Sequence, residues 1–516
     1  MKKLIKAATV ALAAVISLAS FAGCKKPSAN SSTDIEISFW IAGFGEKFID
    51  DIIAGFNEKY PEYNAYKKGS TNSTTLVNTL RLGKNDSTDI YFNSQDNLKN
   101  YRDLFMNLED VVNEKIDGED KTIAEKYDEQ LFRSLKNPDG SLNMLGWAGG
   151  ITGIMYNADI INGKDYKVPK TSKQLQMLTQ SLLNDKRYDH ENFTPFVTFV
   201  DGGYYSYLVK AWMAQYSGID YYNDTWLMLK DADGKSPSKE VYTSKTDGKY
   251  AALEAMTAIF SDETLLYKSN STKKDEAQTK FVQGKAAMMV NGTWMYNEAE
   301  GSGSKTKDFR IMRTPVINAI IDKCESIEDD EELAAVVTAV DEVLDNGADV
   351  VLSGDDYEIT QKDWDTVFDA RRLTYQNGSD HSLIVNKYTN AKEGVKKFIK
   401  YYYSDEGLSR FINATHASAT ARITDESKIN TEGWTENEKR LYNDSSKLVY
   451  VTDGNAVSPM FTNNVMKVYG ELNVVLLMSR GDNPKSAAEI WKDFEGNVTQ
   501  NWSKWLNAAG YEEIKP

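Results

Sequence analysis

Few residues of this chain have the types and spacing that enzyme chemistry needs. Histidine, the usual acid–base side chain near neutral pH, occurs three times, at His190, His381 and His416. There is no H-E-x-x-H or G-x-S-x-G motif, and no G-x-x-x-x-G-K-[ST] loop that would hold the phosphates of ATP. Among 76 Asp and Glu residues, no spacing marks out a pair of glycosidase carboxylates. The sequence therefore predicts a protein that binds and does not catalyse, with no cofactor and no metal.

One cysteine has a setting for covalent modification. Cys24 follows a positively charged start with Lys2, Lys3 and Lys6, an apolar run over 7–19, and the small pair Ala22–Gly23. The run is too short to span a bilayer comfortably and has the charge layout of an export signal. Small residues followed by cysteine resemble a bacterial lipoprotein signal, in which cleavage leaves Cys24 as the new N-terminus with a diacylglycerol on its sulfur. We expect a signal peptide over 1–23 and lipidation of Cys24.

The residues after the cysteine suit a tether. Residues 24–33 are mostly polar and small and are interrupted by Pro27, so we expect a flexible link. Acyl chains bury CH₂ groups at about 0.8 kcal/mol each, and Lys25 and Lys26 add attraction to anionic head groups. No second long apolar run follows. The expected location is outside the cytoplasm, anchored by lipid to the cell membrane.

Composition agrees with an exported binding protein. A chain of 516 residues exceeds the size at which one core stops growing, so two or more domains are expected. A net charge of −16 argues against nucleic acid, whose phosphates demand a basic face. If Cys24 carries lipid, only Cys324 remains, and no intramolecular disulfide can form. Packing must then supply the stability.

Hydrophobic periodicity predicts an α/β architecture. Ile35–Trp40 alternates like a strand and is followed by an amphipathic helix over 46–59. Asp89–Phe92 and Gly153–Asn157 are typical of short buried strands. Strands that alternate with helices at this spacing indicate layers around mostly parallel sheets.

The pattern changes between residues 317 and 370. The acidic run Glu328–Glu332 opens a helix, and a second helix begins after Ile359. An acidic cluster could hold a cation, but a solvated helix start stabilised by the helix dipole is the favoured reading. We expect this segment to be an insertion.

The segment Phe281–Trp294 (FVQGKAAMMVNGTW) has the most specific pattern in the chain. It resembles the F-x-x-G-K-A-A-M-x-x-x-G-x-W signature of the family 1 extracellular solute-binding proteins of ABC importers, the group that includes maltose-binding protein. Asp89–Asp96, Gly146–Trp147, Leu383–Lys387 and Phe398–Gly407 resemble other family segments in the required order. The resemblance covers nearly all of the chain from residue 34.

This resemblance implies a two-lobed periplasmic-binding-protein-like fold (type II) with discontinuous lobes, a hinge and a cleft between the lobes. The chain is expected to cross between lobes near Ala148–Gly149, near Arg313–Pro315 and after Phe411–Ile412. The implied lobes are 34–149 plus 314–416, with the insertion at about 317–370, and 150–313 plus 417–516. Ligand would bind in the cleft and stabilise a closed form, which a membrane permease recognises.

The resemblance also implies a carbohydrate ligand, for which three residues are the first candidates. Sugars need aromatic platforms for their C–H faces and carboxylate or amide groups for their hydroxyls. Trp294 matches the family's platform, with an ordinary core tryptophan as the alternative. Asp96 matches an acid that accepts sugar hydroxyls, although it could also cap the helix that follows. Asn93 stands where the family often has an aromatic residue.

Further candidates come from strand ends and a glycine-rich loop. The first strand–helix junction, the first crossing, the loop after 201–203 and a late loop supply Trp40, Phe44, Glu46, Trp147, Tyr204, Tyr205 and Phe461. A core position is the alternative for Trp40 because Phe39 or Trp40 must point inward.

The predicted function is a monomeric, lipid-anchored receptor that captures a carbohydrate, expected to be an oligosaccharide, and delivers it to an ABC permease. The alternatives are a surface glycan-binding adhesin without transport, a receptor for another polar solute, and a glycan-cleaving enzyme.

Overall fold

A computed structural model describes most of the chain from residue 31 onward. The described residues are 31–41, 43–70, 78–94, 98–137, 139–188, 192–199, 204–230, 237–260, 273–301, 308–376, 381–415, 419–432, 434–453, 458, 460 and 485–511. The predicted signal peptide, Cys24, most of the tether, Asp96 and Phe461 lie outside them. None of the described helices combines the length and apolar character needed to cross a bilayer.

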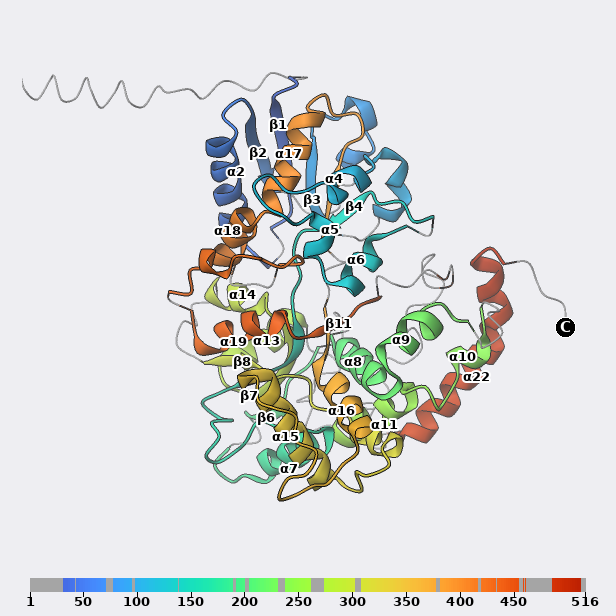
Figure 1. Ribbon diagram of the computed structural model, residues 1–516. Coiled ribbons are helices and arrows are strands. Elements are labelled where there is room, and N and C mark those ends of the chain that lie inside the picture. Colours follow the sequence, from blue (N-terminus) through green and yellow to red (C-terminus); the bar gives the residue numbers. More distant parts are fainter. Residues whose placement is uncertain are drawn as a thin grey trace, which may run out of the picture.

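The first lobe, the upper half of Figure 1, is built on a five-stranded sheet. Its strands, in spatial order, are β2 (Asn64–Ser70), β1 (Asp34–Phe39), β3 (Ile90–Ser94), β10 (His381–Val385) and β4 (Met144–Gly146). Strand β1 is parallel to β2 and β3, whereas β10 is antiparallel to β3 and β4. The carboxyl ends of β1, β3 and β4 therefore share one sheet edge with the start of β10.

The helices of this lobe bury amphipathic faces against the sheet. In α2 (Lys47–Lys59), Phe48, Ile52 and Phe56 recur at helical spacing and are buried. The other described helices are η1 (Gly83–Asn85), η2 (Leu98–Leu104), α4 (Glu109–Asn113), α5 (Ile123–Lys126), α6 (Glu129–Leu135), α17 (Lys392–Tyr402), α18 (Asp405–Thr415) and η7 (Glu426–Lys428).

The second lobe has a four-stranded sheet in the order β6 (Thr194–Phe196), β7 (Ala286–Gly292), β5 (Thr152–Asn157) and β8 (Phe309–Ile311). Strand β7 is parallel to β6 and antiparallel to β5. The carboxyl ends of β6 and β7 therefore lie beside the start of β5. Because β5 begins directly after the first crossing at 147–151, this edge faces the first lobe.

The remaining described helices belong to this second lobe (Figure 1). They are α7 (Ser172–Asn184), α8 (Tyr205–Ser217), α9 (Ile219–Tyr221), η3 (Tyr222–Trp226), α10 (Lys239–Tyr242), α11 (Lys249–Phe260), α13 (Lys274–Val282), α14 (Met295–Gly301), η5 (Asn318–Lys323), α15 (Asp330–Asn346), α16 (Gln361–Arg372), α19 (Glu436–Ser445) and α22 (Ala487–Ala508). A short parallel pair, β9 (Leu373–Tyr375) and β11 (Val449–Val451), lies near the centre of the molecule.

The predicted two-lobed α/β fold is confirmed, because the buried side chains form two large clusters, one around each sheet. The expectation of mostly parallel sheets is wrong, because β10 is antiparallel to β3 and β4, and β5 is antiparallel to β7 and β8. The lobe assignment of the insertion is different from the one we expected. We placed 317–370 with the first lobe, but Ile320, Leu333, Val337 and Val367 pack in the second core. The apolar face of α15 requires a partner surface, and Arg371 on α16 pairs with Asp341 on α15 at 2.8 Å.

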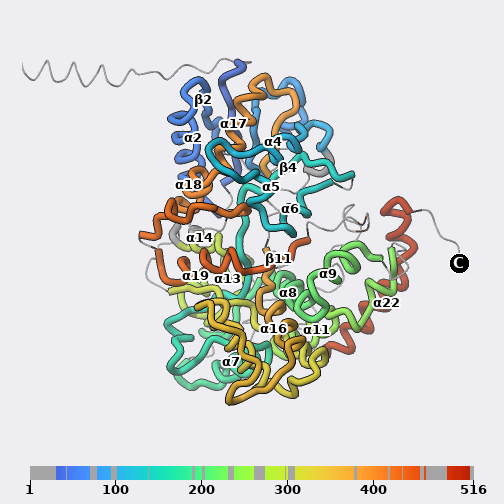
Figure 2. The backbone as a smooth tube through the Cα atoms, viewed as in Figure 1, coloured from blue at the N-terminus to red at the C-terminus, as the bar shows by residue number. Residues whose placement is uncertain are grey.

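The positions of the crossings change accordingly. The chain stays with the second core after Arg313–Pro315 and returns to the first sheet only between 376 and 381. Figure 2 shows α16 in the lower lobe and α17 in the upper one. The range 417–516 also divides: Ala421 and Trp434 pack in the first core, whereas Trp491 on α22 packs in the second.

Candidate ligand site between the lobes

Side chains from both sheets meet where the two sheet edges face each other. From the first lobe, Trp40 follows β1, Trp147 follows β4, and His381 opens β10. From the second lobe, Trp294 follows β7 and Tyr204 precedes α8. The strand directions thus bring side chains such as Trp40, Trp147 and His381, which are more than a hundred residues apart in sequence, to one region.

The first lobe contributes a cluster of rings around His381. Trp40 stacks on His381 with ring centroids 5.6 Å apart, and Phe44 and Trp147 approach its edge at 5.4 Å each. Trp147 is fully buried and its indole N–H donates to the carbonyl of Asn93 at 3.1 Å. Phe44 is also buried, whereas Trp40 is half-buried. Trp40 is therefore the ring that this cluster presents, and Trp147 and Phe44 support it from within the core.

The second lobe contributes a column of rings. Trp294 meets Tyr204 edge-on at 5.5 Å, Tyr204 stacks on Tyr207 at 5.3 Å, and Tyr207 stacks on Tyr375 at 4.4 Å. The Lys210 ammonium lies 4.5 Å from the Tyr375 ring centroid and is paired with Asp453. The column joins β7, α8 and β9, which no local sequence pattern connects.

Trp294 is wedged between the lobes. It belongs to the turn after β7, yet its indole is 6% exposed and packs with the first core. A Cβ added at Gly43 would lie 2.8 Å from the Trp294 Cβ, and one added at Gly292 would lie 2.2 Å from its ring. Both approaches are possible only because these residues lack a side chain.

Four buried polar side chains in this region have no hydrogen-bond partner within the part of the chain that the structure describes. They are the amides of Asn93 and Gln376 and the hydroxyls of Thr293 and Ser382. Asn93 pairs with Ser382 across β3 and β10, so both side chains lie on one face of the sheet. Gln376 abuts the first crossing, where a Cβ on Gly149 would lie 2.8 Å from its amide nitrogen.

Buried polar groups are nearly always hydrogen-bonded, so four unpaired ones in one region call for a ligand or water. Two amides and two hydroxyls offer donors and acceptors without charge. The Tyr204 phenol is also neutral near pH 7, since the ordinary pKa of a tyrosine is about 10 and burial, which outweighs Lys274, raises it further. Together with the rings, the set suits a neutral ligand that has both hydroxyls and apolar faces.

Two polar contacts tie the lobes together beside this region. The Arg133 guanidinium on α6 pairs with Asp224 on η3 at 2.5 Å, and the Asn223 amide donates to Gln130 at 2.8 Å. The Arg133 and Asp224 side chains are 40% and 57% exposed, so these contacts can break without burying a charge.

Two predicted candidates lie away from the rings. Glu46 is exposed and pairs with Lys67 at 3.1 Å at the start of α2. Tyr205 points into the second core, where it meets Phe260 edge-on at 5.1 Å. Asp96 and Phe461 fall outside the described residues, and their roles stay predictions.

Sequence reasoning missed His381, Ser382, Gln376, Tyr207 and Tyr375 as site residues. No motif surrounds them. They reach the site through the pairing of β10 with β3 and through the stacking of Tyr207 on α8 against Tyr375 on β9. The family resemblance covered Leu383–Lys387, but the sequence did not show which strand pairs with β10.

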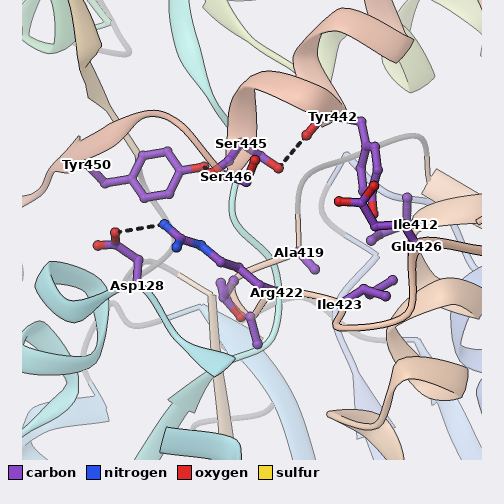
Figure 3. A pocket seen from close by; sticks show the side chains of 12 residues that line it. Asp128, Ile412, Ala419, Arg422, Ile423, Glu426, Tyr442, Ser445, Ser446 and Tyr450 are labelled. Carbon is purple, nitrogen blue, oxygen red and sulfur yellow. Dashed lines mark hydrogen bonds and ion pairs between the residues drawn. The ribbon is translucent and has the colours of Figure 1, made fainter. Parts of the chain in front are cut away.

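A separate small pocket lies between the start of α6, α18, α19 and β11 (Figure 3). Its cavity of about 40 Å³ is crossed by the Arg422–Asp128 pair at 3.5 Å. This pocket contains none of the rings or unpaired amides described above.

The two lobes, the strand ends that face each other and the uncharged polar groups among rings define a solute-binding protein of the two-lobed α/β class. Residues 52–437, more than half of the chain, match the model of the bacterial extracellular solute-binding protein family. The chain belongs to this family, as the sequence resemblance predicted. No curated protein matches the sequence.

Solved structures share the fold at low identity. A family 1 extracellular solute-binding protein from Bifidobacterium longum subsp. infantis is 16% identical, with a TM-score of 0.53 over 91% of this chain and 99% of that one. The solute-binding protein RafE in complex with raffinose is 12% identical, with a TM-score of 0.53 over 90% and 99%. The solute receptor AcbH, described as preferring β-D-galactopyranose, is 12% identical, with a TM-score of 0.56 over 91% and 99%.

Proposed function

We propose that this protein is a lipid-anchored receptor that captures a carbohydrate, expected to be an oligosaccharide, between its lobes and delivers it to an ABC permease. The observation that carries the proposal is the set of amides and hydroxyls without a partner among the described residues, beside the half-buried rings of Trp40 and Tyr204. Sugar hydroxyls would pair with Asn93, Gln376 and Ser382, while a sugar face would stack on Trp40 or Tyr204.

The solved relatives support the choice of ligand class. RafE binds raffinose and AcbH prefers β-D-galactopyranose, so this fold accommodates neutral sugars of different lengths in two of the structures it resembles. The absence of an unpaired charge among the four buried groups favours neutral sugars over uronic acids.

Delivery to a permease and the lipid anchor rest on the sequence. Cys24 follows an export-type segment, and the family consists of extracellular solute-binding proteins. The expected lack of catalysis is part of the same proposal, because a receptor returns its ligand unchanged.

A thermal-shift screen against neutral and acidic glycans tests the proposal. Ligand at 100 times Kd adds about 2.7 kcal/mol to the stability of the folded state, which raises the melting temperature measurably. A stabilising neutral glycan, recovered uncleaved after incubation, supports the receptor. Stabilisation only by acidic glycans, or release of cleavage products, would overturn it.

A further inference from the structure

The two ends of the first-lobe sheet carry different surfaces. The carboxyl ends of β1 and β3 face the second lobe and the candidate site. The opposite end is where β1 begins at Asp34, directly after the predicted tether. In Figure 1 this end is the top of the molecule, away from the second lobe.

Two loops lie at the tether end. Ser87 and Thr88, in the loop before β3, donate their hydroxyls to the Glu36 carboxylate on β1, at 3.0 Å each. The backbone N–H of Asn386, directly after β10, donates to the carbonyl of Asp89 at 3.0 Å. Both loops are therefore neighbours of the point where the tether joins the fold.

The same two loops expose large apolar side chains. Only five large apolar side chains are strongly exposed in the described part of the chain, and two of them are Leu82, at 54%, and Tyr388, at 45%. The two loops approach each other here, since a Cβ on Gly83, the residue after Leu82, would lie 3.7 Å from the Tyr388 ring. The other three, Met177, Val350 and Val351, belong to the second lobe.

Basic side chains surround this apolar pair in a chain of net charge −16. Arg81 and Lys84 flank Leu82 and are exposed, and the Lys387 ammonium lies 5.1 Å from the Tyr388 ring centroid. Acidic residues lie here too: Asp86 and Asp89 are in the loop before β3, Asp103 is on η2 and Glu36 is on β1. Asp86 is half-buried, and burial raises its pKa to about 6, which weakens its negative charge at mildly acid pH.

We propose that this surface, formed by Arg81, Leu82, Lys84, Lys387 and Tyr388, rests on the anionic bilayer into which the lipid anchor inserts. The inference rests on the proposed anchoring. Basic residues are attracted to anionic head groups, and exposed aromatic and aliphatic side chains suit the interface. A ten-residue tether spans at most about 35 Å, so it holds this end near the bilayer at a high effective concentration. The first lobe is then oriented with its ligand edge away from the lipid.

The test compares hydrogen–deuterium exchange in the lipoprotein on vesicles and in an unanchored chain that begins at Lys25. The vesicles contain phosphatidylcholine with or without phosphatidylglycerol. We expect several-fold slower exchange in peptides covering 81–88 and 386–389 on the anionic vesicles, reduced by high salt. Peptides that contain Met177 or Val350 should be unchanged. Equal exchange at 81–88 in the anchored and free chains overturns the proposal.

Variants separate the surface from the anchor. Leu82→Asp with Lys84→Glu should remove the protection while flotation with the vesicles and glycan affinity persist. The matched control, Met177→Asp, alters an equally exposed apolar residue on the second lobe and should leave the protection intact. Protection that survives the double variant also overturns the proposal.

A chemically attached lipid distinguishes failure of the proposed lipidation from failure of the proposed surface. If the native chain does not float with vesicles, the proposed lipidation is wrong. A Cys324→Ser chain that begins at Cys24 is then coupled through that thiol to a maleimide lipid. Protection at 81–88 in this form supports the surface, and its absence overturns it.

Discussion

The indole of Trp294 packs so closely on Gly43 that a methyl group on that glycine would lie 2.8 Å from the tryptophan Cβ. One residue belongs to the second lobe and the other to the first. We therefore expect Gly43→Ala to push the lobes apart and to disfavour the closed form, because a contact below 3.0 Å forces the neighbour to move. Ligand affinity should fall several-fold.

Small-angle scattering of Gly43→Ala, without and with a verified ligand, measures the change. Gly45→Ala provides an imperfect comparison, because Gly45 has open space for a Cβ but a positive φ of 73°. Gly496→Ala, with open space on α22, is the cleaner control. An unchanged profile and wild-type affinity for Gly43→Ala would show that the contact does not govern closure.

Replacing Trp294 itself should weaken both ligand binding and folding. A buried aromatic residue truncated to alanine costs roughly 3–5 kcal/mol of stability, and Trp294 is 6% exposed. Loss of a ring contact to ligand costs on the order of 2 kcal/mol, about thirtyfold in affinity. Calorimetric titration and thermal melting of Trp294→Ala give the two numbers separately. Wild-type affinity in a destabilised variant would remove Trp294 from the ligand site.

Cys24→Ala should release the protein from the membrane or leave it unprocessed. The sulfur that would carry the diacylglycerol is lost, and no other long apolar run follows residue 24. Fractionation with metabolic lipid labelling checks the outcome, with Cys324→Ser as the matched control. A Cys24→Ala protein that still carries lipid in the membrane fraction would place the modification elsewhere.

The fold was predictable because its signals are local. The alternation of Ile35–Trp40 marks strand β1, which lies where the sequence placed it, and the family segment FVQGKAAMMVNGTW contains strand β7. The lobe of the insertion was not predictable, because the apolar face of α15 is compatible with either core. Asp341 on α15 forms ion pairs with Lys170 and Arg313 of the second lobe, and no sequence pattern links residues that far apart.

The site was predictable only in part for the same reason. Trp40 and Trp294 follow strands, so their place at sheet edges could be inferred from local pattern. Burial of Trp147 depends on Phe48 from α2, which stacks on it at 5.2 Å, and on Phe411 from α18 at 6.3 Å. Those helices are separated from Trp147 by about a hundred residues or more, and periodicity does not report which rings meet.

Arg133→Ala should shift the protein toward a more open form without unfolding either lobe. The pair with Asp224 is exposed and joins α6 to η3, so its loss costs about 0–1 kcal/mol. Such a change alters the open–closed balance up to about fivefold. Scattering or a fluorescence pair across the lobes reports it, and affinity should fall by the same factor.

The matched control is Arg187→Ala, which breaks a pair with Asp165 at 2.7 Å that is similarly exposed but lies within the second lobe. Its lobe separation should equal that of the wild type. A common change in both variants would point to net charge as the cause and not to the contact between lobes.

Asn93→Ala and Gln376→Ala should each weaken ligand binding while leaving stability unchanged or slightly raised. Both amides are buried without a hydrogen-bond partner among the described residues, so removing them deletes no protein contact and relieves a desolvation cost. When the amide is gone, a ligand that hydrogen-bonds to it loses about 1–3 kcal/mol of binding free energy, roughly fivefold to more than a hundredfold in affinity.

Asn386→Ala is the control and should lower stability while leaving ligand affinity unchanged. Its buried amide donates to the Thr88 carbonyl at 3.2 Å, outside the ligand edge. Titration should therefore show weaker binding only for the two site variants, and melting should show lower stability only for Asn386→Ala. If Asn93→Ala and Gln376→Ala bind the ligand as the wild type does, the unpaired amides hold water and the ligand lies elsewhere.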